Sequence, residues 1–507
     1  MSLFRVKPLG RLMGDMESGA QRLKRTLGPT QLTALGIGAI MGAGIFSTIG
    51  SASAGGSNHI GAGPAIILSF ALTAVACGFA ALCYAEFAAM VPIAGSAYTY
   101  AYATLGELLA WIIGWDLIIE YAVGNVAVAI SWSGYFQALL RNLGVAMPAW
   151  LGVDLRSAAE AARQVAEVAS QGGEVASLGP GVLRAAEAMA QAPHVLGWPL
   201  VFNLPAFLIV MAITWVLVIG IRESAWLTGV LTALNIGILI FFCVVGSRYV
   251  EPANWTPFMP NGWAGVSGAA AIIFFAYIGF DAVSTAAEET RNPQRDMPIG
   301  MIASLVICTV IYIAVAAVLS GMVSWRTLGT AEPLSTAFSA RGITWASGII
   351  AFGAVCATAG VLLVFQLGQP RIFFSMARDG LLPQWAAKVH PKYRTPHVTT
   401  ILTGVVVAVF AGIANINEVV ELTNIGTLFA FVLVAIGILV LRRTNPEAPR
   451  PFRTPLVPLV PILAILSCAF LMIQLPWITW VRFGIWLALG LVFYFIYGYR
   501  HSKLRSS

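Results

Sequence analysis

Residues 35–50, LGIGAIMGAGIFSTIG, are apolar enough to enter a bilayer, yet they include Gly36, Gly38, Gly42, Gly44 and Gly50. A glycine inside a helix costs about 1 kcal/mol relative to alanine, so this cluster predicts an interrupted helix. For Gly36 and Gly38 a role in close helix packing alone stays equally open. Interrupted backbone persists in a membrane only where it lines a protein cavity. The stretch GAGIF therefore indicates the edge of a buried site.

A second apolar segment with a break lies much later in the chain, at residues 274–285, FFAYIGFDAVST. Interrupted helices in corresponding halves of a membrane protein are typical of a substrate site near the middle of the bilayer. The two stretches together predict such a site.

The composition indicates a membrane protein. Of 507 residues, 58% are hydrophobic and only 10% are charged, with a mean hydropathy of +0.83, whereas soluble domains carry about 25% charged residues. A spanning helix needs about 20 apolar residues, which predicts an all-α polytopic protein with twelve transmembrane helices. The expected spans are 32–55, 64–90, 98–139, 200–220, 225–247, 265–286, 298–321, 343–369, 398–414, 419–441, 456–474 and 480–499.

Loop charges predict the orientation. Of the 29 Lys and Arg residues, 21 fall on the side of the N-terminus and 8 on the opposite side. Cytoplasmic loops carry the basic excess, so both termini are expected in the cytoplasm. The same rule accounts for the net charge of +7 without a nucleic-acid partner. Residues 1–31 lack an apolar core and are interpreted as a cytoplasmic tail, not a cleaved signal peptide.

One loop is much longer than the others. Residues 142–197 contain SAAEAARQVAEVAS and VLRAAEAMAQA, separated by a Gly- and Pro-containing turn. Alanine and glutamate favour helix, so a helical hairpin outside the membrane, opposite the termini, is expected. Its role as a solvated cap or as a partner-binding surface stays open.

Ionisable residues inside the spans are functional candidates, because a charge at mid-membrane costs at least ~2.5 kcal/mol. Asp116 and Glu120 are four residues apart and share one helical face, which should look into the protein. Glu120 can neutralise a cationic substrate, carry a proton, or hold the interrupted helix by a hydrogen bond. A neutral carboxyl that merely bonds a neighbouring helix is the alternative.

Other polar residues lie close to the predicted interruptions. Asp281 follows the second one and, with Tyr277 and Phe280, either lies on the substrate pathway or caps a restarting helix. Asn235 is a lone polar residue in the fifth span, expected to face the first helix. The cysteines and histidines show no ligand spacing, so neither a metal nor a cofactor is predicted.

Five motifs in order resemble the amino acid, polyamine and organocation transporter superfamily, and most closely its cationic amino acid transporter family. They are TLGPTQLTALGIGAIMGAGIF (26–46), EFAAMVPIAGSAYTYAY (86–102), WIIGWDLIIEYAVG (111–124), FFAYIGFDAVSTAAEETRNPQRDMPIG (274–300) and QPRIFFSMARDGLLP (369–383). The resemblance implies the leucine-transporter fold. Two inverted five-helix repeats would occupy residues 32–247 and 248–441, and two further helices and the C-terminal tail residues 442–507.

The resemblance also implies how an L-amino acid would be held. Backbone amides at the start of a half-helix would bind its carboxylate, carbonyls of both interruptions would bind its ammonium, and Phe275 would close over it as an aromatic gate. The implied amides belong to Ala43, Gly44 and Ile45, and the implied carbonyls to Ile40, Phe275, Ala276 and Ile278. Gly42 is the eighth residue of the implied substrate site.

The sequence departs from the resemblance at one position. Proton-coupled bacterial members carry a lysine in the fifth span where this chain has Asn235, which puts coupling through such a lysine in doubt. Asparagine there is similar to the animal cationic amino acid transporters, which act mostly as facilitators. Glu120 is then the remaining candidate for coupling.

These features predict a secondary transporter that imports cationic or broad-range L-amino acids by alternating access, with proton coupling left open. The alternatives are a facilitator or exchanger of small neutral amino acids or polyamines, and a nutrient sensor of the same fold. The sequence contains no P-loop and no HExxH motif, so neither ATP drive nor enzymatic chemistry is indicated. A bacterial inner (plasma) membrane is the expected location. Lipid or a small single-span protein can cover the outer faces of the last two spans.

Overall fold

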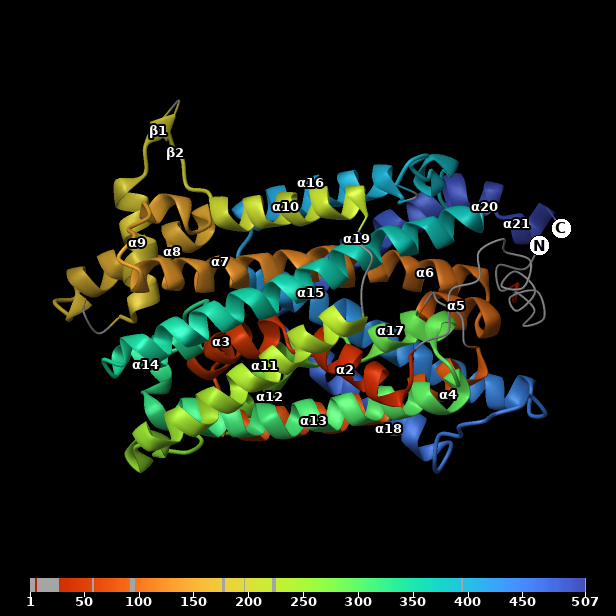
Figure 1. Cartoon of the computed structure of the whole chain (residues 1–507), viewed down its shortest axis with the longest axis horizontal. Helices are drawn as coiled ribbons and strands as arrows, with labels where there is room; N and C mark the ends of the chain where they lie inside the picture. Colours follow the sequence, from red (N-terminus) through yellow and green to blue (C-terminus); the bar gives the residue numbers. More distant parts are fainter. Residues whose placement is uncertain are drawn as a thin grey trace.

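The chain is built almost entirely from helices, which run side by side along the long axis of the molecule (Figure 1). This computed structural model describes residues 5–6, 27–56, 59–91, 96–175, 178–195, 197–220, 225–393 and 395–506. Most of the basic N-terminal tail, and the loop residues Arg222 and Arg394, lie outside this part of the chain.

The first half of the chain contains the following helices and strands. They are α2 (Pro29–Ile40), η1 (Gly44–Thr48), α3 (Ile49–Ala54), η2 (Gly63–Ala65), α4 (Ile66–Met90), α5 (Ser96–Thr104), α6 (Glu107–Ile118), η3 (Ile119–Val123), α7 (Gly124–Asn142), η4 (Ala149–Leu151), α8 (Leu155–Ser170), α9 (Pro180–Gln191), β1 (His194–Val195), β2 (Trp198–Pro199), α10 (Leu204–Ile219), α11 (Ala225–Gly246) and η6 (Ser247–Tyr249).

The second half continues the helical pattern. Its elements are η7 (Pro252–Trp255), α12 (Gly262–Ile273), η8 (Phe274–Tyr277), η9 (Asp281–Glu289), α13 (Pro293–Met322), η10 (Trp325–Thr327), α14 (Pro333–Ala340), α15 (Thr344–Arg378), η11 (Gln384–Ala387), α16 (His397–Ile413), α17 (Ile416–Thr444), α18 (Leu459–Ile473), α19 (Trp477–Phe493), η12 (Tyr494–Gly498), α20 (Tyr499–His501) and α21 (Lys503–Ser506).

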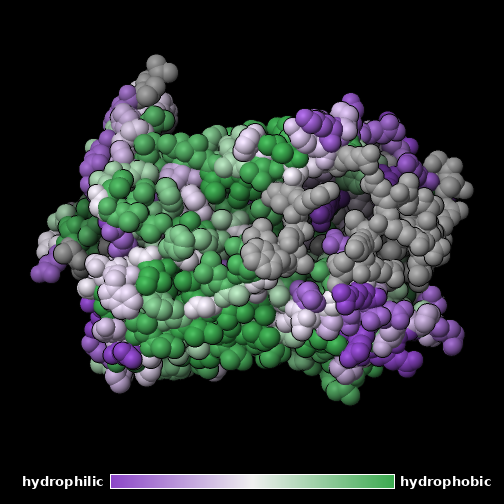
Figure 2. All heavy atoms as spheres, in the orientation of Figure 1, coloured by the Kyte–Doolittle hydropathy of each residue, from purple (hydrophilic) through white to green (hydrophobic). Residues whose placement is uncertain are grey.

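Among the described residues, nine helical segments are long and apolar enough to cross a membrane, and α10, α16 and α18 are shorter apolar helices. Each of the twelve expected spans overlaps one of these segments. Figure 2 shows a broad apolar surface over the middle of the molecule, with hydrophilic residues gathered at its two ends. The prediction of an all-α polytopic membrane protein is confirmed.

The prediction for the third span, 98–139, was wrong at its start. The chain forms the separate helix α5 and then turns at Gly106, whose φ is +94°, before α6 begins at Glu107. A residue with a side chain is strained at such a φ, so glycine permits the turn. The eighth span also differs, because α15 continues through Pro370 to Arg378, beyond the expected end at residue 369.

The two ends of the molecule differ. The described residue Arg5 lies beside α21 at one end, and the α8–α9 hairpin with the small β1–β2 ribbon lies at the other end (Figure 1). At the hairpin end Glu332 forms two ion pairs, one with Arg141 at 2.8 Å and one with Arg184 of α9 at 2.9 Å. The hairpin is therefore tied to the bundle near α14.

The centre of the bundle surrounds α2 and α12, the helices that precede the two interruptions. Helix α2 packs against α13 and α11, and α12 packs against α4. Buried residues from all of these helices belong to one hydrophobic core. This packing places both interruptions inside protein, away from lipid.

Candidate functional site: two facing helix interruptions

The first interruption separates α2 from η1. Helix α2 ends at Ile40, Met41 leaves the helical region with φ −77° and ψ 77°, and helical backbone resumes at Gly44. The first amides of a helix have no acceptor within it, and the aligned peptides give that end a partial positive charge. The amides of Ala43, Gly44 and Ile45 occupy this position.

Two side chains from neighbouring helices hold the carbonyls that α2 leaves at its end. The Tyr312 hydroxyl of α13 donates to the Ile40 carbonyl at 2.9 Å, and the Asn235 amide of α11 donates to the Met41 carbonyl at 3.4 Å. Asn235 thus faces the first helix, as its sequence position predicted. Tyr312 was not singled out, although an aromatic hydroxyl in the apolar run VICTVIYIAV is the signal that points to it.

The second interruption separates α12 from η9. The turn η8 ends at Tyr277, Ile278 is extended with φ −61° and ψ 133°, and Gly279 has φ +121°. A Cβ on Gly279 would lie 2.7 Å from the Ala39 carbonyl oxygen. Glycine is required here by both the backbone conformation and the close approach of α2.

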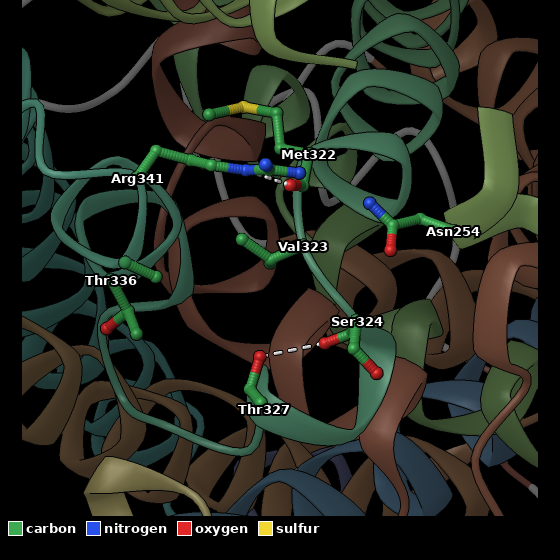
Figure 3. Close-up of a pocket in the computed structure, with 8 residues that line it drawn as sticks. Asn254, Met322, Val323, Ser324, Thr327, Thr336 and Arg341 are labelled. Atoms are coloured by element: carbon green, nitrogen blue, oxygen red, sulfur yellow. Dashed lines mark hydrogen bonds between the residues drawn. The ribbon is translucent and has the colours of Figure 1, made fainter. Parts of the chain in front are cut away.

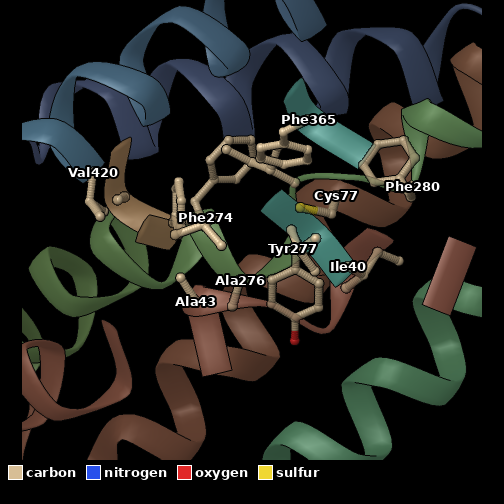
Figure 4. Close-up of a cluster of buried hydrophobic side chains, with 14 of the residues drawn as sticks. Ile40, Ala43, Cys77, Phe274, Ala276, Tyr277, Phe280, Phe365 and Val420 are labelled. Atoms are coloured by element: carbon tan, nitrogen blue, oxygen red, sulfur yellow. The ribbon is translucent and has the colours of Figure 1, made fainter. Parts of the chain in front are cut away.

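The two interruptions are in direct contact. A Cβ on Gly44 would lie 2.1 Å from the Ala276 Cα, so nothing larger than glycine fits without displacing the second segment. Figure 4 shows Ala43 and Ala276 next to each other at this crossing. The partly positive start of one half-helix therefore lies beside the backbone of η8, which is suited to binding a small zwitterion.

The predicted binding residues are brought together and enclosed. All eight of them are buried, and the large residue Phe275 is only 5% exposed. Surrounding side chains are apolar or aromatic, including Phe274, Phe280 and Phe365 (Figure 4). The geometry is that of a closed site whose walls offer few polar groups to a substrate side chain.

The predicted pathway residues Tyr277 and Phe280 also lie in this buried region. The Tyr277 hydroxyl donates to the Phe70 carbonyl of α4 at 3.1 Å, and the Phe280 ring packs against Phe431 of α17 at a centroid distance of 5.1 Å. Both side chains thus connect the second interruption to neighbouring helices.

Three buried carboxyl groups lie on the α6, η3 and η9 segments. Asp116, Glu120 and Asp281 are 1%, 4% and 1% exposed. Asp281, Asp116 and the Thr427 hydroxyl group of α17 lie near Glu120, and the side-chain oxygens of these three neighbours make no hydrogen bond of standard geometry. Within the described residues, no ion pair joins any of the three carboxyls to a base.

Asp281 lies at the start of η9. The residue at the N-cap position of η9 is Phe280, without a side-chain cap hydrogen bond, and neither carboxyl oxygen of Asp281 makes a hydrogen bond of standard geometry. The carboxyl lies close to the backbone amides of its own segment and to Glu120. Both roles left open by the sequence therefore stay predictions.

A polar chain missed by sequence reasoning lies beyond the carboxyl cluster. The Asn125 amide donates to the Gln366 carbonyl oxygen, and the Gln366 amide donates to the Thr214 hydroxyl at 3.2 Å. These residues come from α7, α15 and α10, so no local pattern joins them. Their bonds tie together three helices beside the site.

Two surface cavities lie away from the interruptions. One is at the hairpin end, where Arg341 donates to the Met322 carbonyl at 2.6 Å (Figure 3). Arg341 also forms an ion pair with Glu251. The other cavity is at the opposite end, beside α20 and α21. Neither is lined by a residue of the predicted substrate site.

An enclosed crossing of two interrupted helices, within an apolar helical bundle, is typical of a membrane transporter. Comparison with known sequences makes this specific: the amino acid permease family matches residues 27–496, and the chain belongs to that family.

Its relatives carry several names. It is 45% identical to the branched-chain amino acid permease BcaP of Bacillus subtilis and 44% identical to the methylthioribose transporter of the same organism, each over 99% of both chains. It is 36% identical to the vacuolar cationic amino acid transporter 2 of Arabidopsis thaliana, over 89% of this chain and 65% of the relative. The resemblance to the amino acid, polyamine and organocation superfamily is confirmed.

Proposed function

We propose that this protein imports L-amino acids across the bacterial plasma membrane by alternating access, and that apolar side chains are its preferred cargo. The contact of Gly44 with Ala276 carries the proposal. The amides of Ala43, Gly44 and Ile45 bind the substrate carboxylate, and the carbonyls of Ile40, Phe275, Ala276 and Ile278 bind its ammonium group. These main-chain groups recognise the part that all amino acids share.

Selectivity follows from the walls of the site. Apolar side chains such as Phe274 and Phe365 favour an aliphatic substrate, because burial of each methylene contributes about 0.8 kcal/mol. BcaP is named for branched-chain amino acids, which supports this choice. A preference for cationic or broad-range amino acids is the second candidate, supported by the named cationic transporters and by the buried Glu120 carboxyl.

Uptake into proteoliposomes tests the substrate. Labelled leucine is loaded by counterflow, and unlabelled isoleucine, arginine, alanine and methylthioribose compete. Inhibition by isoleucine at a concentration at least tenfold below that of arginine supports the apolar assignment. Stronger inhibition by arginine than by isoleucine supports a preference for cationic amino acids. Inhibition by methylthioribose alone contradicts both substrate assignments. An absence of counterflow with every amino acid contradicts the transport proposal.

Glu120 and Asp281 together form the proposed coupling group. A carboxylate without a basic partner costs at least ~2.5 kcal/mol inside a membrane, and two facing carboxylates repel each other. The pair therefore holds a proton when the site is closed to water and releases it when one side opens. Asn235 occupies the position of the lysine in proton-coupled relatives and serves a structural role at the end of α2.

Uptake measured with an imposed proton gradient distinguishes a proton-coupled transporter from a facilitator. Gradient-driven accumulation of leucine in the wild type, lost in Glu120→Gln and Asp281→Asn while counterflow persists, is the expected result. Glu421→Gln is the matched control, since that buried carboxyl accepts from the Thr479 hydroxyl at 2.8 Å and lies outside the pair. Accumulation unaffected by the gradient in the wild type would mean a facilitator or exchanger, with Glu120 structural.

The termini are placed in the cytoplasm in this proposal, with the α8–α9 hairpin outside. The basic excess on the terminal side supports the assignment. Fusion of a reporter that fluoresces only in the cytoplasm to the C-terminus tests it. The small single-span partner stays a prediction, because lipid suits the exposed apolar faces of α18 and α19 equally well.

A further inference from the structure

The α8–α9 hairpin is attached along one edge, through α9, to the segment that precedes α14. Arg184 of α9 forms an ion pair with Glu332 at 2.9 Å, and the Glu332 side chain is only 6% exposed. An added Cβ on Gly181 would lie 2.9 Å from the Thr330 methyl carbon, so the first turn of α9 packs directly on this segment. The ion pair is therefore supported by close packing.

The other edge of the hairpin, α8, is attached to the turn between α16 and α17. The Asn415 side-chain amide donates to the Ser157 hydroxyl at 2.9 Å, and Arg156 forms an ion pair with Glu418. Glu418 also pairs with Arg482 of α19 at 2.8 Å. The two helices of the hairpin pack on each other and share a small apolar cluster. The hairpin is thus a packed unit that is held at both edges.

The segment that α9 holds, residues 328–332, lies directly on η1 and α3. The Ser47 hydroxyl of η1 donates to the Ala331 carbonyl, and an added Cβ on Gly50 of α3 would lie 2.3 Å from the Leu328 carbonyl oxygen. These two helical segments run from the first interruption toward the hairpin end of the molecule (Figure 1). Residues 328–332 therefore cover the half-helix of the predicted substrate site on the side of the hairpin.

Glu332 joins the hairpin to this covering segment. Its carboxylate pairs with Arg184 and also with Arg141, near the end of α7, at 2.8 Å. A hydrogen bond to a charged group is worth about tenfold or more in an equilibrium constant. Movement of the segment away from η1 separates Glu332 from Arg184, because the hairpin stays attached to the α16–α17 turn. The ion pair therefore opposes that movement.

We propose that the α8–α9 hairpin is a strap that holds the substrate site closed on the side of the hairpin, and that the ion pair of Arg184 with Glu332 must break before this side opens. The inference rests on the proposed transport by alternating access. A substrate that enters or leaves at the hairpin end reaches the amides at the start of η1 only after residues 328–332 have moved. The strap stabilises the closed arrangement and makes such opening less frequent.

The reactivity of a cysteine at position 131 tests the strap without any transport. Ser131 is fully buried, its hydroxyl lies 2.5 Å from that of Ser47, and it is one turn of α7 from Gly134, where an added Cβ would lie 2.9 Å from the Ala331 Cβ. The covering segment thus shields it on the side of the hairpin. In purified Ser131→Cys protein, Arg184→Gln should raise the rate of reaction with N-ethylmaleimide at residue 131, followed by peptide mass spectrometry, about tenfold.

Arg163→Gln is the matched control, since this residue of α8 is exposed and forms no ion pair with any residue that the structure describes. Its reaction rate at residue 131 should equal that of the Ser131→Cys parent. Arg141 still pairs with Glu332 in Arg184→Gln, so this variant should fold. An unchanged rate in Arg184→Gln, or an equal increase in Arg184→Gln and Arg163→Gln, overturns the proposal.

A disulfide between α9 and the covering segment tests the strap in the opposite direction. An added Cβ on Gly181 would lie 3.6 Å from the Thr330 Cα, which is within the reach of a disulfide. Oxidised Gly181→Cys/Thr330→Cys should lose leucine counterflow at least tenfold and regain it on reduction, whereas neither single variant should respond to the oxidant. Wild-type counterflow in the oxidised double variant overturns the strap. If the wild type itself shows no counterflow, the proposed function fails, and the reaction rates at residue 131 alone decide whether the hairpin closes this side.

Discussion

Gly44 and Ala276, one from each helix interruption, lie in backbone contact, and a methyl group on Gly44 would come within 2.1 Å of the Ala276 Cα. Gly44→Ala must therefore push the two segments apart. We expect at least a tenfold loss of leucine counterflow and a loss of stability of about 1–3 kcal/mol, typical of overpacking. Counterflow and Tm of the same preparation measure both effects.

Gly78→Ala is the control for this substitution. Gly78 lies within α4, and an added Cβ there meets nothing within 4 Å. Since alanine favours helix over glycine, transport should be kept and Tm unchanged or slightly raised. Similar losses in both variants would show that the crossing has no special steric requirement.

Removal of the Tyr312 hydroxyl tests how the end of α2 is held. This group donates to the Ile40 carbonyl at 2.9 Å, and a hydrogen bond of this kind is worth about 0.5–1.5 kcal/mol. Tyr312→Phe should raise the KM for leucine about three- to tenfold, with a smaller change in Vmax, because a carbonyl of the binding site loses its orientation. Tyr249→Phe, on an exposed residue of η6, should leave the KM unchanged. An unchanged KM in both variants would argue that Ile40 takes no part in binding.

We expect the ion cluster around Glu86 to dominate the stability of the end of the molecule at which α4 and α17 end. Glu86 is fully buried, accepts two hydrogen bonds of 2.9 Å from Arg442, and lies 3.3 Å from the buried Arg450 guanidinium. Glu86→Gln leaves these charges without compensation, which costs about 3–5 kcal/mol. Tm should fall by several degrees.

Glu251→Gln is the comparison, because the pair of Glu251 with Arg341 is largely exposed and such pairs contribute little. Its Tm should stay close to that of the wild type. A Tm for Glu86→Gln equal to that of Glu251→Gln would contradict the importance of the buried cluster.

His59 lies in the loop after α3, and we expect it to make the stability of the folded protein depend on pH. Burial lowers the pKa of this imidazole from its ordinary value of 6.5, and the contact with the Ser51 carbonyl at 3.1 Å opposes the shift only in part. Below pH 6.5 the folded state therefore binds fewer protons than the unfolded state. The contribution of His59 to the free energy of unfolding is present above pH 6.5, and it is lost as the pH falls through the lowered pKa that His59 has in the folded state.

The Tm of His59→Gln should accordingly depend less steeply on pH than that of the wild type between pH 7.5 and 5. His194→Gln is the control, since His194 lies exposed in the β1–β2 ribbon, and its curve should follow the wild type. Parallel curves for the wild type and His59→Gln would contradict the assignment.

The sequence by itself determined the properties that depend on local composition. Apolar segments about 20 residues long located the twelve spans, and the glycines around Gly42 located the first interruption, because a glycine-rich segment weakens a helix wherever it folds. The face shared by Asp116 and Glu120 was also predictable, since four residues make about one helical turn. The misplaced start of the third span came from Gly106, whose positive φ ends a helix that hydrophobicity alone would continue.

Only the tertiary structure decided which of these segments meet. Helices such as α4 and α10 are apolar on every side, so their sequences do not indicate which face looks inward and which faces lipid. The proximity of Glu120 to Asp281 and the bond from Tyr312 to Ile40 both join residues far apart in the chain. Such contacts depend on the rotation and packing of whole helices, a property of the assembled bundle and not of any one stretch.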